Sequence, residues 1–490
     1  MKSNINNKTI LPGLLSLLLL ATACNKALDI NQDPNNPSLD QGNPRLVFPA
    51  AVMATAGMEG GDIAILGGIW GQYFTQSALA NQYKYIDAYD VKSTDLNAQY
   101  SGLFTGGLKN YQFVINKARD AQDWNFYLMS EVMRAYTAGL LVDLYDKIPY
   151  SEALGGASDL NPHFDNGDAI YADLIAGIDS ALTKDFTASS NSVPGTADLI
   201  FAGDMDKWKR FANTMELKLY LRMVNTNATE AQAGIQRLYT NGAEFLQTDA
   251  GVFGFTDAPG QDNPLFEQNI RQLNTPNNLR ASRTFVSWLQ ENNDPRIVSY
   301  FGTNAPNSIH QGDYLGTDPT YASAAVFVQL PTDPVIFISA AESYFLQAEA
   351  RERYFSGDQA ESLYNQGVLA AFASVGQDGS PFITGAYKYP TGSLEQKVEA
   401  IVTQKWASFA YGVHFIEGFF EKQRTGYPLT SPVYSTDGSY VPGQFVVSKN
   451  SVLPPGALPR RLAYPDVEVS RNNNTPELIP ITTPVWWGKP

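Results

Sequence analysis

The chain has 490 residues, a formal net charge of −15 and a single cysteine. Its length suffices for two or three domains or one large elaborated domain, and its negative charge argues against nucleic acid and against anionic lipid headgroups as partners. The negative charge favours neutral or cationic partners. With no second cysteine the chain forms no internal disulfide, so its stability depends on packing and we expect a large core.

The N-terminus has the pattern of a lipoprotein secretion signal. Two lysines precede an apolar run over 10–20, and a triplet of small residues leads to Cys24. The run is about half of the roughly 20 residues that a membrane-spanning helix needs, and small residues before a cysteine fit a lipoprotein cleavage site. We therefore predict that residues 1–23 are a signal peptide and that Cys24 carries the lipid. A plain signal peptide and a buried apolar helix are the alternatives.

Residues 24–45 are predicted to be a lipidated tether and lead-in, followed by one folded region over 46–490. The segment 28–37 is polar and broken by prolines, so it cannot be helical. Its alternating Asp and Asn residues imitate a calcium-binding loop, but Pro34 stands where such a loop requires glycine. The sequence therefore predicts no metal site here.

Apolar residues recur at helical spacing in the first half of the folded region. We predict two short helices within 47–77, interrupted by glycine pairs, and then an antiparallel pair over 103–118 and 126–144. A second pair is predicted over 170–182 and 204–219. The aspartates at positions 165 and 204 are the predicted N-caps of this second pair.

The helical spacing returns in the second half of the chain. A third pair is predicted to begin at Phe337 and to continue over 358–373, and a fourth covers 394–409 and 413–423. The charged residues of the third pair, Glu342 and Glu349 among them, are expected on a solvated or salt-bridged face. About four helix pairs predict a mostly α fold, in which a tetratricopeptide-like scaffold carries a loop-rich second half.

Many aromatic residues lie in irregular segments. Residues 81–95 alternate tyrosine with polar residues and are expected to form an exposed loop or strand, with the rings of Tyr83 and Tyr85 on one side. Residues 240–332 and 427–490 are rich in Asn, Gly, Pro and aromatics. Long irregular segments on a rigid scaffold commonly carry function, although most of the rings are expected to fill the core.

The sequence contains few residues that could carry catalysis. The histidines at 163, 310 and 414 have no second histidine or cysteine at metal-ligand spacing. There is no glycine-rich phosphate loop before a helix and no nucleophile elbow. We therefore predict no catalytic residues, metal, cofactor or enzymatic activity. A paired-carboxylate hydrolase stays open because carboxylates are abundant.

Short fragments spread from Cys24 to Trp487 are weak singly and specific in their order. They are Leu-Asp-Ile-Asn-Gln-Asp-Pro-Asn-Asn-Pro at 28–37, Asp-Lys-Ile-Pro-Tyr-Ser-Glu-Ala-Leu at 146–154, Phe-Asp and Ala-Ile-Tyr-Ala-Asp-Leu within 164–174, Trp208 with Arg-Phe-Ala-Asn at 210–213, Asn-Asp-Pro-Arg at 293–296, Ala-Glu-Ser-Tyr-Phe-Leu-Gln-Ala-Glu at 341–349, Gln-Lys-Trp at 404–406, Arg-Thr-Gly-Tyr-Pro at 424–428, Arg-Leu-Ala-Tyr-Pro at 461–465 and Trp-Trp at 486–487. In this order they resemble the SusD/RagB family of outer-membrane nutrient-binding lipoproteins.

The resemblance implies four tetratricopeptide-like helix pairs and a function. Such a protein is anchored by its lipid in the cell outer membrane, faces the exterior, binds a glycan or another oligomeric nutrient, and passes it to a TonB-dependent transporter. A peptide-binding member of the same family and a surface hydrolase are the alternatives. The resemblance also implies that Arg296 and Arg424 brace the packing rather than contact the ligand.

By analogy with the family, ligand contacts are expected from two places, the loop after the first helices and the middle irregular region. The aromatic residues there are Trp70, Tyr83, Tyr85, Tyr89 and Tyr314.

Overall fold

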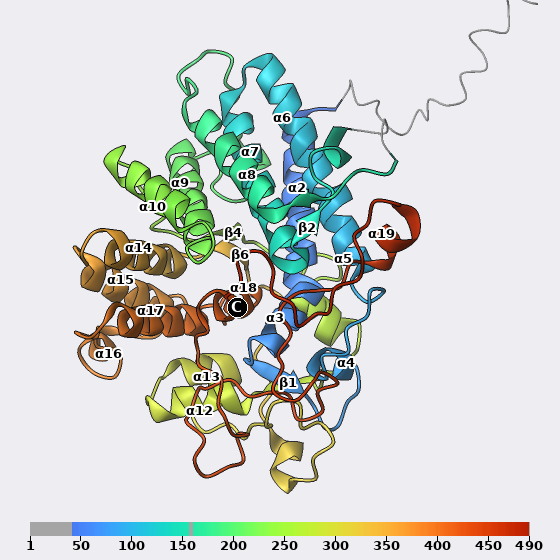
Figure 1. The fold of residues 1–490 in the computed structure, drawn as a ribbon, viewed down its shortest axis with the longest axis vertical. Coiled ribbons are helices and arrows are strands. Elements are labelled where there is room, and N and C mark those ends of the chain that lie inside the picture. Colours follow the sequence, from blue (N-terminus) through green and yellow to red (C-terminus); the bar gives the residue numbers. More distant parts are fainter. Residues whose placement is uncertain (1–41, 156–159, 490) are drawn as a thin grey trace, which may run out of the picture.

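The computed structural model describes residues 42–155 and 160–489 (Figure 1). The predicted lipid attachment site at Cys24 and the lead-in at 28–37 lie outside the described residues. Helices dominate the described part, and its strands are short. None of the helices in this part combines the length and the apolarity needed to cross a membrane.

The first helices form a kinked rod through the interior. α2 (Pro44–Met58) leads into a π-helical turn, where Gly61 has a non-helical backbone, and then into α3 (Ala64–Trp70). The first predicted glycine pair therefore does interrupt the helix, whereas the second lies inside α3. There a Cβ atom on Gly67 would stand only 2.4 Å from the backbone nitrogen of Ile416, so this helix crossing requires glycine.

Longer helices follow one another along an arc, from α6 at the top of Figure 1 to α17 at the lower left, with α18 inside the arc. The mostly α fold is thus confirmed, and helices that are neighbours in sequence pack together, as α6 does with α7, α9 with α10, and α14 with α15. Their bounds are α6 (Lys109–Ala121), α7 (Trp124–Tyr145), α8 (Gly167–Leu182), α9 (Met205–Arg222), α10 (Ala228–Thr240), α14 (Ala340–Tyr354), α15 (Ala360–Ala373), α17 (Leu394–Ser408) and α18 (Ile416–Thr425).

The structure differs from the prediction in the start of one helix and in one additional helix. Phe337 does not begin a helix, because Val335–Ile338 forms β6, which pairs with β4 (Ala250–Val252). α14 begins after Ser339, whose side chain accepts a hydrogen bond from the backbone N–H of Glu342. Helix α10 lies in a segment that the periodicity left unassigned, and it covers α9.

Of the two predicted N-caps, one is confirmed. The Asp204 side chain accepts hydrogen bonds from two backbone N–H groups of the first turn of α9. Asp165 does not cap α8, because its carboxylate accepts from the backbone N–H groups of Tyr150 and Ser151 instead. Asp165 itself belongs to a strand, which positions the hairpin before α8.

The loop-rich regions contain only short elements. The strands of the described residues pair into three antiparallel sheets of two strands each, one of which is β4 with β6. The other two pair β1 (Phe74–Gln76) with β5 (Leu279–Ala281) and β2 (Lys147–Ile148) with β3 (Asp165–Asn166). The remaining short helices are α4 (Lys84–Asp87), α5 (Asn97–Gly102), α11 (Pro264–Phe266), α12 (Arg283–Glu291), α13 (Arg296–Phe301), α16 (Ser380–Thr384) and α19 (Asp466–Arg471).

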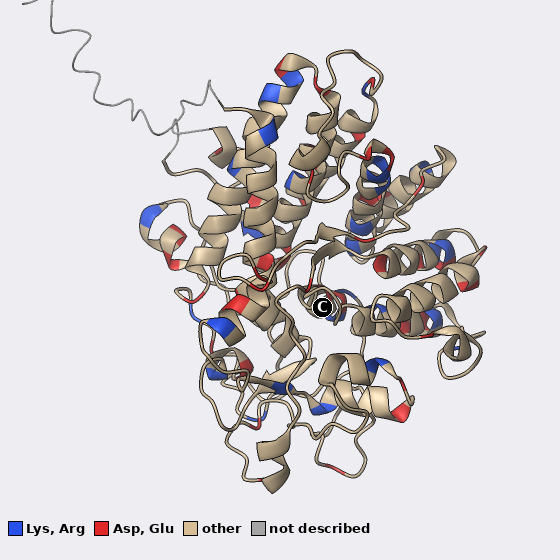
Figure 2. Ribbon diagram, turned by 180° about the vertical axis from the view of Figure 1, so that it is seen from behind, with Lys and Arg blue, Asp and Glu red and all other residues tan. Residues whose placement is uncertain are grey.

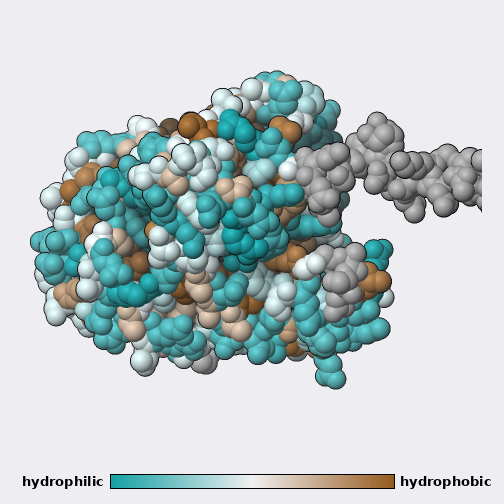
Figure 3. All heavy atoms as spheres, turned by 90° about the horizontal axis from the view of Figure 1, so that it is seen from above, coloured by the Kyte–Doolittle hydropathy of each residue, from teal (hydrophilic) through white to brown (hydrophobic). Residues whose placement is uncertain are grey.

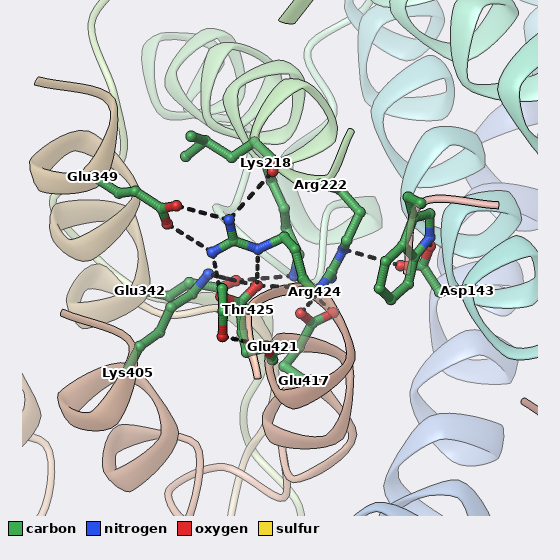
Figure 4. A network of polar contacts seen from close by, with 12 residues as sticks. Asp143, Lys218, Arg222, Glu342, Glu349, Lys405, Glu417, Glu421, Arg424 and Thr425 are labelled. Atoms are coloured by element: carbon green, nitrogen blue, oxygen red, sulfur yellow. Dashed lines mark hydrogen bonds and ion pairs between the residues drawn. The ribbon is translucent and has the colours of Figure 1, made fainter. Parts of the chain in front are cut away.

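A buried network of ion pairs joins α9, α14, α17 and α18 (Figure 4). Arg424 of α18 donates to both carboxylate oxygens of Glu349 of α14, each at 2.7 Å. In the same network Arg222 of α9 lies 2.7 Å from Glu417 of α18. Because an unpaired buried charge is costly, these partners must all be in place together, which fixes the four helices relative to one another.

The network bears on two sequence-based expectations. Of the solvated and salt-bridged alternatives for Glu342 and Glu349, the salt-bridged one holds, and both side chains are fully buried. Helical periodicity does not distinguish a solvated charged face from an internal one. Arg424 and Arg296 are also buried, the latter paired with Asp294 at 2.6 Å, and they brace the packing as expected.

The surface mixes charges of both signs with single apolar residues. Figure 2 shows Lys and Arg interspersed with Asp and Glu along the helices. On the face seen in Figure 3, hydrophobic residues are scattered among hydrophilic ones. Exposed apolar side chains such as Leu46, Leu79 and Leu160 are ordinary on protein surfaces and do not by themselves mark a binding face.

Candidate functional site

The predicted ligand-binding aromatics lie mostly inside the protein. The exposed fractions are 4% for Trp70, 3% for Tyr83, 2% for Tyr89 and 9% for Tyr314, and Tyr85 alone is partly exposed. The segment 81–95, expected to be an exposed loop or strand, forms no strand: it is irregular apart from the short helix α4 at Lys84–Asp87, and it is largely buried around Tyr83 and Tyr89. The Trp70 indole donates a hydrogen bond to the carbonyl of Ile86 at 3.1 Å, so this ring anchors the segment to α3.

Beneath these rings, Asp87 joins two of the loop regions. Its carboxylate accepts hydrogen bonds from the Thr75 hydroxyl at 2.6 Å, from the backbone N–H of Gln76 at 2.9 Å and from the Gln311 amide at 2.9 Å. Burial raises the pKa of Asp87 to about 6, although these three hydrogen bonds favour the charged form. The segment after the first helices and the middle irregular region therefore meet at Gln311.

The C-terminal irregular region reaches the same point. The Tyr434 hydroxyl donates to the Gln311 carbonyl at 2.7 Å, and the Tyr434 ring lies 5.9 Å from the ring of His310. The two segments from which ligand contacts were expected therefore meet around Gln311, and the C-terminal region, which was not among them, joins them there.

Beside Gln311 an open cavity of about 530 Å³ lies against the start of α12. Its walls come from α12, from the two irregular regions and from the short 3₁₀ helix Pro319–Ser323. The lining residues are Arg283, Gln290, Ala305, Pro306, Asn307, Ser308, His310, Asp318, Thr320, Tyr321, Ser435 and Thr436. None of the five predicted aromatics is among them. No sequence motif marks the lining residues. The sequence signal for this cavity is only that most of its segments lie in irregular regions.

The cavity is polar, and several of its groups are held in place. His310 Nδ1 lies 2.7 Å from the Ser435 hydroxyl, and the Asn307 amide donates to the Ser323 hydroxyl at 2.8 Å. Burial and the nearby Arg283 lower the pKa of His310, so its ring is neutral at pH 7. The cavity therefore offers guanidinium, amide, imidazole and hydroxyl groups, which suit hydrogen bonding to a ligand rich in hydroxyls.

A second cavity, of about 440 Å³, lies between α6, α7 and α8. Its polar groups are paired with each other or with adjacent groups. Arg134 lies 2.7 Å from Glu131, and the Tyr150 hydroxyl donates to Asp173 at 2.7 Å. Fewer groups are left to meet a ligand there. Within 42–155 and 160–489 no cluster of three or more His, Cys, Asp or Glu residues could hold a metal ion.

Comparisons with known proteins agree on one family. Residues 67–447 match the family model SusD-like_2, described as "Starch-binding associating with outer membrane". None of the curated proteins matches the sequence.

Solved structures share the fold. A chitin-binding SusD homologue from Flavobacterium johnsoniae has a TM-score of 0.70 at 21% identity, covering 91% of this chain and 97% of its own. A SusD homologue from Bacteroides uniformis has a TM-score of 0.70 at 20% identity, covering 92% and 100%. A SusD/RagB family protein from Bacteroides thetaiotaomicron has a TM-score of 0.71 at 19% identity, covering 92% and 100%.

Proposed function

This chain belongs to the SusD-like family, and we propose on that basis that it is a cell-surface lipoprotein that binds a glycan and hands it to a TonB-dependent transporter. The family model's description associates its members with starch and with the outer membrane. Lipidation at Cys24 would anchor the protein, and stable anchoring takes more than one acyl chain.

The observation that supports glycan binding most directly is the polar cavity beside Gln311. Its volume of about 530 Å³ is in the range of small-ligand sites. Arg283 and Gln290 line it with side chains that carry N–H donors, and Tyr321 also lies in its wall, whereas the Thr320 hydroxyl donates to Asp318 at 2.7 Å. A neutral sugar offers hydroxyls to such donors and a C–H face to a ring.

The expected affinity is modest. A few net hydrogen bonds and one or two ring contacts, at about 1 kcal/mol each, give roughly 4 to 7 kcal/mol of binding free energy. That range corresponds to dissociation constants from about millimolar to about ten micromolar. Weak binding suits capture followed by release to a transporter better than tight storage.

Calorimetry with starch, chitin and other oligosaccharides, and with peptides, tests the proposal. Arg283→Ala removes a charged donor from the cavity wall and should weaken binding of the cognate sugar about tenfold. Gln290→Ala should weaken it less. The matched controls are Arg119→Ala and Gln366→Ala, which change exposed residues far from the cavity lining.

Wild-type affinity in both cavity variants would show that the ligand binds elsewhere. Binding of peptides in place of sugars would favour the peptide-binding alternative. Circular dichroism of each variant checks that the fold is kept.

One contact in the cavity favours the hydrolase alternative. The Ser435 hydroxyl lies 2.7 Å from His310 Nδ1, a distance at which imidazole can accept a serine proton. Ser435 is only 7% exposed, however, and the hydrogen bonds of the described residues include none from the His310 ring to a carboxylate. We therefore propose binding without turnover. Sustained release of reducing ends that Ser435→Ala abolishes would contradict this.

A further inference from the structure

Three cations line one cavity at the C-terminal end of α18. The cavity has a volume of about 450 Å³, and Lys422, Arg460 and Lys489 lie in its wall with the side chains of Thr430 and Thr482. The three cations come from segments that backbone hydrogen bonds hold together. The Lys489 N–H donates to the Gln423 carbonyl at 3.0 Å, and the Arg460 N–H donates to the Ile481 carbonyl at 2.6 Å.

The described residues supply no carboxylate to offset this positive charge. Across 42–155 and 160–489, no carboxylate lies within ion-pair distance of Lys422, Arg460 or Lys489, although the chain as a whole is acidic. The buried cations of the network in Figure 4 differ, because each of them has a carboxylate partner. Burial, followed by the charges of Arg460 and Lys489, lowers the pKa of Lys422 to about 7.

Capping of α18 accounts for part of this arrangement. Lys422 donates to the carbonyls of Gly426, at 2.7 Å, and of Pro428, and Lys489 donates to the carbonyl of Thr425 at 3.3 Å. A helix C-terminus carries only about half of a negative elementary charge, so it offsets a fraction of three cations. In addition, Arg460 Nε is buried and has no hydrogen-bond partner. Part of the positive charge of the three side chains is therefore not offset, and the Nε–H of Arg460 can still donate a hydrogen bond.

We propose that this cavity binds an oxyanion, that is, a carboxylate, sulfate or phosphate group of a small ligand. A guanidinium matches the geometry of such a group, two ammonium groups add charge, and the threonine hydroxyls can complete its hydrogen bonds. An anion here supplies the missing counter-charge of Lys422, Arg460 and Lys489. Because this cavity shares no lining residue with the polar cavity at Arg283, the proposal stands independently of the proposed glycan site.

The test titrates sulfate, phosphate and glucuronate by calorimetry at constant ionic strength set with chloride, with glucose as the neutral control. The protein is the full chain carrying Cys24→Ser and extended by a neutral C-terminal linker, so that no chain terminus lies near Lys489. Saturable binding of at least one oxyanion is expected at pH 6. Lys422 holds its proton at pH 6 and loses it by pH 9, so binding of sulfate and glucuronate, whose own charge is constant over this range, should weaken at least about fivefold at pH 9. Arg460 and Lys489 are the charged groups that face Lys422.

Substitutions separate a built site from general attraction. Lys489→Gln and Arg460→Gln should each weaken binding about tenfold, whereas Lys388→Gln, an exposed lysine outside the cavity, should not change it. Lys489 is exposed, so its variant is expected to fold, and circular dichroism checks both variants.

Two sources of the oxyanion are possible, a free inorganic ion and an acidic sugar. Comparing the sulfate and phosphate titrations with the glucuronate titration distinguishes them. Two results would overturn the proposal. One is no saturable binding beyond the chloride control. The other is equal affinity in the wild type and both cavity variants.

Discussion

Replacing Arg424 by leucine removes the central cation of the buried network in Figure 4. The guanidinium is shared by Glu349, at 2.7 Å from each of two nitrogens, and by Glu421, at 2.6 Å. The three side chains are 1%, 1% and 3% exposed, respectively. Arg424→Leu therefore leaves two carboxylates buried with less positive charge beside them. The expected result is a large loss of stability.

The size of the loss follows from the burial and from the pKa of Glu349. Removing one partner of a buried ion pair typically costs about 3 to 5 kcal/mol. Burial alone would raise the pKa of Glu349, but Arg424 and then Arg353 outweigh it and lower that pKa to about 2. Because the folded pKa is below the unfolded value of 4.5, the stabilisation is present above pH 4.5 and is lost as the pH falls through 2.

Urea and thermal unfolding at pH 7 and pH 3 measure this effect. For a chain of this size, about 1 kcal/mol shifts the melting temperature by roughly 1 °C, so a fall of roughly 3 to 5 °C is expected at pH 7. The difference in stability between Arg424→Leu and the wild type should be smaller at pH 3 than at pH 7. The control Lys92→Met removes an exposed ion pair with Asp90 and should change stability by at most about 0.5 kcal/mol.

A double variant tests whether the unpaired charge is the cause. Arg424→Leu with Glu349→Leu removes one of the two stranded carboxylates and should recover part of the lost stability. If Arg424→Leu is as stable as the wild type at pH 7, the reasoning from buried charge is wrong. It is also wrong if the loss of stability in the double variant equals the sum of the losses in Arg424→Leu and in Glu349→Leu measured singly.

Three further changes give separate readouts. Burial disfavours a charged His414, but Glu342 and Glu59 outweigh this effect and raise the pKa of His414 from 6.5 to about 9. The contribution of His414 to the stability of the fold is therefore complete below pH 6.5 and is lost as the pH rises through 9. His414→Gln should remove about 3 kcal/mol of that pH dependence in urea unfolding, and an unchanged slope would contradict it. Cys24→Ser should move the protein out of the membrane fraction, and full retention there would exclude the lipid as the anchor. Tyr85 is partly exposed but does not line the polar cavity, so Tyr85→Ala should leave glycan affinity within about twofold of the wild type by calorimetry, with unchanged circular dichroism; a loss of about fivefold, about 1 kcal/mol, would place a ligand contact at Tyr85, outside that cavity.

The sequence predicted the scaffold because helical periodicity and buried contacts leave local signals. The fragments that carried the family resemblance supply much of the buried framework. Arg296 pairs with Asp294 within one fragment, and Glu349 and Arg424 from two others meet in the ion network. Glu349 and Arg424 are tied to partners far along the chain, and a resemblance in the order of fragments detects such residues even when their contacts are not predicted.

The cavity residues left no such signal. Arg283 and Gln290 lie on α12 while Asn307 and Ser435 lie on two distant segments, and each is an ordinary polar residue in its local sequence. The alternation around Tyr83 was misleading for a related reason. A ring next to polar neighbours can face solvent or the interior, and only the tertiary contacts decide which.

The burial of the predicted aromatics changes how their substitution must be interpreted. Tyr83 has its backbone N–H bonded to the Gln76 side chain at 2.6 Å, and Gln76 bonds in turn to Asp87, which holds Gln311. His310, the neighbour of Gln311, lines the polar cavity. Tyr83→Ala would therefore leave a void in the layer that supports the cavity wall, and a loss of glycan affinity in that variant would not demonstrate contact with the ligand. Only a lining residue such as Arg283, whose removal leaves the supporting layer intact, can separate direct contact from support.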